Sequence, residues 1–91
     1  MTPAREHEAG LPVDPERLRR QFPALTDEDL AAYGEITRRV LADPRARGRV
    51  LADVLASAAL AAQKEASGAA LDEGERTALA YVRALRKMQS R

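Results

Sequence analysis

Helix-start signals recur along the chain at intervals that predict a series of short helices. Asp14 and Asp43 are each followed by proline, which is the order of an N-cap and a first helical residue. Thr26 precedes three consecutive acids, and Asp72 with Glu75 three residues later has the spacing of a capping box. The helices predicted from these signals cover about 15–22, 27–42, 45–66 and 73–89.

The residues between these signals favour helix over strand. The chain has nineteen alanines and only three aromatic residues, and β-branched residues are few. The connections around Asp43 and around Gly68, a residue suited to a left-handed helix end, are short enough to predict antiparallel neighbours. The predicted fold class is therefore all-α: an up-down-up three-helix bundle with a short N-terminal lead-in helix, pinned by Leu18 and Phe22.

Ninety-one residues allow one domain with a modest core. Residues 1–13 contain two prolines and a glycine and have no apolar periodicity, which predicts a mobile N-terminal arm. Residues 14–91 form the predicted single helical-bundle domain. The core positions predicted for the third helix are Val50, Leu51, Val54, Leu55, Ala58 and Ala62, and those for the last helix are Leu79, Val82, Leu85 and Met88.

The residue types needed for catalysis are missing or scattered. The single histidine, His7, lies in the predicted arm between Glu6 and Glu8, and a metal site needs three or four ligands in fixed geometry. There is no cysteine, and the five glycines are too dispersed for a phosphate loop. We therefore predict no catalytic residues, no metal and no cofactor, and a protein that is not an enzyme.

The start of the chain and its hydropathy predict a cytoplasmic protein without a membrane partner. The first ten residues are polar and do not form a signal peptide. The longest uncharged apolar stretch, 54–62, is far shorter than the ~20 residues of a membrane span.

Charge is distributed unevenly although the net charge is only +1. An up-down-up bundle brings together the end of the second helix, the start of the third and the end of the last. The bases predicted to gather at this arginine pole are Arg38, Arg39, Arg45, Arg47, Arg49, Arg83, Arg86 and Lys87. Arg45, Arg47 and Arg49 begin a helix, where the dipole disfavours cations. They indicate either an anionic partner, nucleic acid or acidic protein, or an arginine-rich loop without a role.

A second pattern lies on the third helix beside its predicted core stripe. Ala52, Ala56 and Ala59, then Gln63 and Ala66, follow alternating steps of four and three residues, and small residues at such steps allow another helix to approach closely. Leu60 points to the same side and would be exposed in a monomer. The pattern predicts a helix-contact face, although alanine also simply fills exposed helical positions.

These observations favour a small non-enzymatic helical interaction or adaptor protein that binds a protein partner or itself. The alternative is a nucleic-acid-binding protein that grips the phosphate backbone through the arginine pole, without reading bases.

Overall fold

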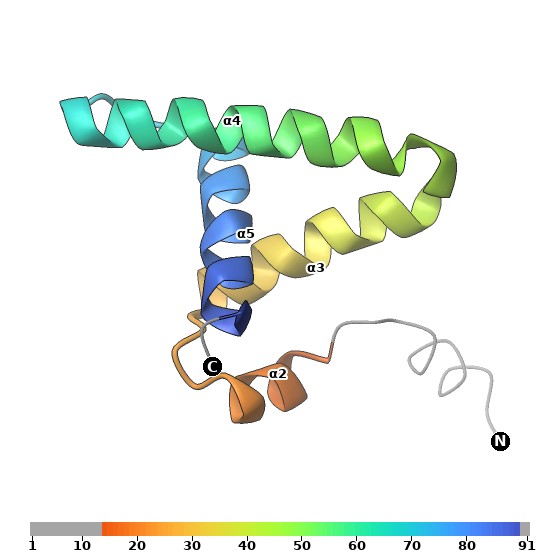
Figure 1. Cartoon of the computed structure of the whole chain (residues 1–91). Helices are drawn as coiled ribbons and strands as arrows, with labels where there is room; N and C mark the ends of the chain where they lie inside the picture. The colour runs from red at the N-terminus through yellow and green to blue at the C-terminus, as the bar shows by residue number, and fades with distance from the viewer. Residues whose placement is uncertain (1–13, 90–91) are drawn as a thin grey trace, which may run out of the picture.

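The computed structural model describes residues 14–89 and has an all-α fold (Figure 1). The predicted helix ranges are confirmed to within two residues at each boundary, and no strand occurs in the described part of the chain. The predicted mobile arm, 1–13, and His7 within it lie outside the described residues. The helices are α2 (Pro15–Gln21), α3 (Asp27–Ala42), α4 (Arg47–Ser67) and α5 (Glu73–Gln89), with a 3-10 turn at Pro44–Ala46.

Local hydrogen bonds set most of the helix ends as the sequence predicts. The Thr26 hydroxyl accepts from the Asp29 amide and the Asp29 carboxylate accepts from the Thr26 amide, both at 3.1 Å. Asp72 and Glu75 form the same reciprocal capping box at 2.7 and 3.0 Å. Gly68 closes α4 in the left-handed conformation, with φ of 81°. Each of these ends is fixed by residues within a few positions of it.

Asp43 does not cap the third helix as predicted. Its side chain makes no capping hydrogen bond, because the 3-10 turn separates it from the first amides of α4. Ala46 occupies the cap position of α4 and has no side-chain acceptor. The N-terminal amides of α4 are consequently left without a side-chain cap.

The arrangement of the long helices differs from the predicted up-down-up bundle, which is not confirmed. From the turn that joins them, α3 and α4 diverge like the sides of a V, and α5 runs across the space between them (Figure 1). α5 packs extensively on both, whereas α3 and α4 touch each other only sparingly. A short connection requires the two helix ends that it joins to be close together, but it does not determine the angle between the helices.

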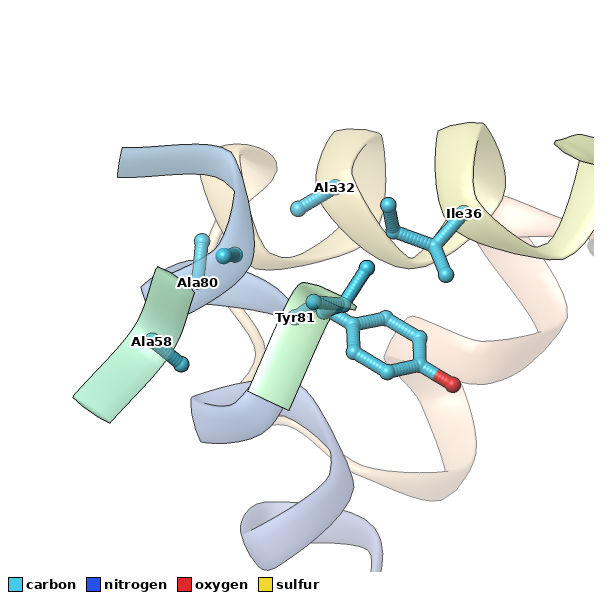
Figure 2. Close-up of a cluster of buried hydrophobic side chains, with 7 residues drawn as sticks. Ala32, Ile36, Ala58, Ala80 and Tyr81 are labelled. Atoms are coloured by element: carbon cyan, nitrogen blue, oxygen red, sulfur yellow. The ribbon is translucent and has the colours of Figure 1, made fainter. Parts of the chain in front are cut away.

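The packing of Tyr81 accounts for the open angle. This residue of α5 lies between Ile36 of α3 and the buried side of α4 (Figure 2). Its ring stacks on Tyr33 with centroids 5.9 Å apart and an interplanar angle of 15°. Around the ring the buried residues are small, among them Ala58 and Ala80, so α5 approaches both neighbours closely. A large residue between α3 and α4 and small residues along α5 together produce the crossing.

The lead-in helix α2 is held as predicted. Leu18 and Phe22 pack against a second buried cluster formed by Leu25, Leu30 and Ala84. This cluster joins α2 to the start of α3 and the end of α5.

The predicted core stripe of the third helix is partly wrong. Val54, Ala58 and Ala61 are the buried residues of α4, whereas Leu55 and Ala62 are exposed. Because α5 crosses α4 on the side of Val54, Leu55 is turned away by the ~100° that separates successive helical residues. Leu55 is a surface residue, with 55% of its area exposed.

Candidate interaction surfaces

One long side of α4 presents apolar residues to solvent. We define the outer face of α4 as Ala52, Leu55, Ala56, Ala59, Leu60 and Gln63, all of which are exposed. Leu55 and Leu60, at 55% and 48%, are two of the three exposed large hydrophobic residues among those described; the third is Leu41 on α3. All five residues of the predicted helix-contact face thus lie in the outer face, which also includes Leu55.

The rest of the described fold leaves this face open. α2, α3 and α5 all lie on one side of α4, and the C-terminal end of α4 projects beyond α5 (Figure 1). Val54, Ala58 and Ala61 are buried on the side toward α5. The outer face is on the opposite side and runs along most of the helix.

A shallow groove borders the outer face on each flank. Leu55, Ala59 and Ala62 line a groove of about 400 Å³ between α4 and α5. Leu60 and Asp53 line another, of about 470 Å³, on the other flank. The two leucines therefore stand at opposite edges of a strip whose middle is formed by small residues.

The predicted arginine pole is divided in the structure. Because α5 ends beside the start of α3, Arg83 and Lys87 lie against Asp29, not at the α3–α4 turn. Arg86 borders the groove between α4 and α5. The expectation that all eight bases share one pole is therefore wrong. The five that remain near the α3–α4 turn, which we call the hairpin arginines, are Arg38, Arg39, Arg45, Arg47 and Arg49.

Asp29 is the centre of a buried charge network. Its carboxylate is fully buried and accepts a hydrogen bond of 2.5 Å from Lys87, while Arg83 lies 3.5 Å away. Lys87 also donates to the carbonyl of Ala24 at 2.9 Å. Burial raises the pKa of Asp29, but the hydrogen bonds from Lys87 and Thr26 outweigh it and hold this pKa below its ordinary value. Lys87 and Arg83 thus connect α5 to the start of α3.

A similar pair joins α4 to α5. Lys64 contacts Glu75 at 2.8 Å, and Glu75 also belongs to the capping box of α5, where its carboxylate accepts from the Asp72 amide. The hydrogen bond from Lys64, followed by that from the Asp72 amide, lowers the pKa of Glu75; the pKa of Lys64 is raised by the same bond. Both buried carboxylates of the described residues are therefore engaged in capping and ion pairing.

The hairpin arginines have far fewer partners. All five are exposed, and Arg39 alone has a carboxylate close by, Glu35 at 3.6 Å. Within residues 14–89, Arg38, Arg45, Arg47 and Arg49 form no ion pair. Arg45, Arg47 and Arg49 lie in or just before the first turn of α4, which has no side-chain cap and contains no acid. The helix dipole makes this a mildly unfavourable position for cations.

Leu55 is the residue of this surface that the sequence analysis missed, because it was assigned to the core. It shares the helical spacing of Ala52 and Ala59, three residues before it and four after it, which places it beside the contact face as readily as beside Val54. Spacing alone does not separate the two sides of a helix as rich in alanine as α4.

Among residues 14–89, no group of acids and histidines is arranged to hold a metal ion. No helix in that range is long and apolar enough to cross a membrane. Comparison of the chain with protein-family models, curated proteins and solved structures gave no match.

Proposed function

We propose that this chain is a small non-enzymatic interaction protein that binds a protein partner, or another copy of itself, through the outer face of α4. The observation that carries the proposal is the exposure of Leu55 and Leu60 on a helix side that nothing in the described fold covers. We also propose that it acts in the cytoplasm, since a chain without cysteine fits a reducing compartment.

The composition of the face suits a helical partner. Burying a leucine side chain contributes ~1.5–3 kcal/mol, and Leu55 and Leu60 are each about half exposed before binding. Ala52, Ala56 and Ala59 between them allow the backbone of a second helix to come close. The face therefore offers apolar area at its edges and room at its centre.

A photoreactive amino acid placed on this face tests the proposal in the cells that make the protein. We expect a residue introduced at Ala59 to form covalent adducts with a polypeptide, whether this chain or another. The matched control is Ala31, which is also an exposed alanine within a helix but lies on α3. Equal adduct formation at the two positions, or none at Ala59, would contradict a dedicated contact face.

Binding of nucleic acid through the hairpin arginines is the second candidate. The observation in its favour is that four of the five hairpin arginines, all of which are exposed, have no carboxylate partner among the described residues. The division of the predicted pole reduces the number of available cations from eight to five. A phosphate-gripping protein loses affinity steeply with salt, whereas contact through the outer face of α4 depends little on salt. Binding measured over a range of salt concentrations separates the two candidates.

A further inference from the structure

The two ends of α4 carry opposite charge. The N-terminal end has Arg45, Arg47 and Arg49 and no acid in its first turn. The C-terminal end has the exposed Glu65 and the last carbonyls of the helix, which bear the negative end of its dipole. The one base in this last turn, Lys64, is paired with Glu75 at the start of α5. Each end of α4 is thus complementary to the other end, not to itself.

This polarity selects one orientation for a pair of α4 helices. Two copies running in the same direction would place arginines beside arginines. Two copies running in opposite directions place each arginine end beside the carbonyl end and Glu65 of the other copy, and their dipoles also oppose. Charge complementarity therefore favours an antiparallel pair.

The spacing on the outer face defines the register of such a pair. Ala52, Ala56, Ala59 and Gln63 are separated by steps of four, three and four residues, so these four positions are symmetric about the point between residues 57 and 58, and Ala66 extends the row by three residues at one end. A two-fold axis at this point places Ala56 opposite Ala59 of the second copy. Residues 48–67 then overlap over ~30 Å at ~1.5 Å per residue. Alternating steps of three and four are also the spacing at which two helices stay in contact.

The exposed leucines fit the same register. A two-fold axis keeps each flank of one helix beside the same flank of the other. Leu55 then lies beside Ala59 and Ala62 of the second copy. In each copy these two alanines line the groove between α4 and α5. Leu60 on the other flank lies beside Ala56 and Asp53 of the second copy, since Asp53 lines the same groove as Leu60. Leu55 thus meets only alanines, and Leu60 meets one alanine and one aspartate, so neither leucine clashes with another large apolar side chain.

We propose that the outer face of α4 binds a second copy of this chain, in an antiparallel two-fold pair with Ala56 opposite Ala59. This inference rests on the proposed function and narrows it to one occupant.

Cysteine crosslinking tests the orientation and the register together, because the natural chain has no cysteine. In the proposed pair, residue 56 of one copy is offset from residue 56 of the other by ~4.5 Å along the axis, while residue 66 is offset by ~25 Å. We expect Ala56→Cys to give mostly crosslinked dimer with a short bifunctional maleimide, and Ala66→Cys to form the same pair but to give no crosslinked dimer. Ala66 is a matched control, since it is an exposed alanine on the same helix. Far-ultraviolet circular dichroism verifies that both variants are folded.

Sedimentation of the unmodified chain provides the second measurement. We expect a dimer at micromolar concentration, and at least a tenfold weaker association for Ala56→Glu, which places a charge at the centre of the contact. Crosslinking of Ala66→Cys as strongly as Ala56→Cys would overturn the antiparallel register. A chain that sediments as a monomer throughout would overturn the pair itself. If photoadducts at Ala59 then contain a different protein, the proposed function stands; if no adducts form, it fails as well.

Discussion

The two ends of α3 are both surrounded by basic residues but use them differently. At the N-terminal end, Thr26 and Asp29 cap the helix, and Lys87 from α5 completes the network around the buried carboxylate. At the C-terminal end, Asp43 is exposed and its side chain makes no capping hydrogen bond, and most of the hairpin arginines have no carboxylate partner in the described fold. Bases at the first end are part of the folded structure, whereas those at the second end remain available for binding.

The largest expected difference between the two ends concerns their aspartates. Asp29→Ala removes a cap and leaves Lys87 without its buried partner, so we expect a loss of ~2–4 kcal/mol in unfolding free energy. Asp43→Ala removes an exposed side chain that makes no capping bond, so it should change the unfolding free energy by less than ~0.5 kcal/mol. Urea denaturation measures both variants. Similar losses for the two would remove the distinction between the ends.

Acid should weaken the N-terminal end selectively. The pKa of Asp29 is lowered in the folded state, so its contribution is present above the ordinary carboxyl pKa of about 4 and is lost as pH falls through the lower folded value. We expect unfolding free energy to decline below about pH 4. Glu75, whose pKa is also lowered, contributes in the same direction. The decline should be shallower in Asp29→Ala and unchanged in Asp43→Ala.

Removing the charge of Lys87 should have an intermediate effect. Lys87→Gln loses a hydrogen bond between charged groups that is partly open to solvent, and we expect a cost of ~1–2 kcal/mol. Its exposed neighbour Arg86 forms no ion pair within the described residues and is a matched control. Arg86→Gln should therefore lie within ~0.5 kcal/mol of the parent. Thermal unfolding compares the two, and equal costs would show that Asp29 does not depend on Lys87.

The smallest effect is expected at the hairpin arginines. Replacing Arg45, Arg47 and Arg49 together with glutamine should leave the melting temperature of the dilute protein unchanged or raise it slightly, because repulsion at a helix N-terminus is relieved. The same variant should bind its anionic partner less well. With nucleic acid, the slope of log affinity against log salt should become shallower by about one per lost phosphate contact. A clear loss of stability would instead make these arginines structural.

Helix boundaries were predictable from the sequence because local bonds determine them. The pairs Thr26 with Asp29 and Asp72 with Glu75 form their capping bonds without reference to the rest of the fold. Gly68 likewise ends α4 through its own conformation. The failure at Asp43 has a local cause as well, since an inserted 3-10 turn is not visible in an aspartate followed by proline.

The residue pattern could not predict how α5 crosses its neighbours, or which side of α4 is buried. On α5 the buried apolar residues are Ala78, Ala80, Tyr81 and Ala84, whereas the larger apolar residues predicted to face inward are only half-buried. Alanine suits a helix whether buried or exposed, so an alanine-rich helix gives a weak signal for its buried side. The predicted contact face was located on the exposed side of α4, but its binding role stays a prediction. The predicted arginine pole was wrong because it was derived from the up-down-up bundle, an arrangement that differs from the one observed.

The stacked tyrosines give this protein an intrinsic ultraviolet signal that comes from one part of its core. The chain has two tyrosines and no tryptophan, so its near-ultraviolet signal originates almost entirely from Tyr33 and Tyr81, whose rings are 5.9 Å apart. Burial, and then the nearby Tyr33, raise the pKa of Tyr81, so its phenolate should form late in an alkaline titration. Ultraviolet spectroscopy of the unlabelled chain therefore follows the packing of α5 on α3 and on the buried side of α4, while the outer face of α4 is silent.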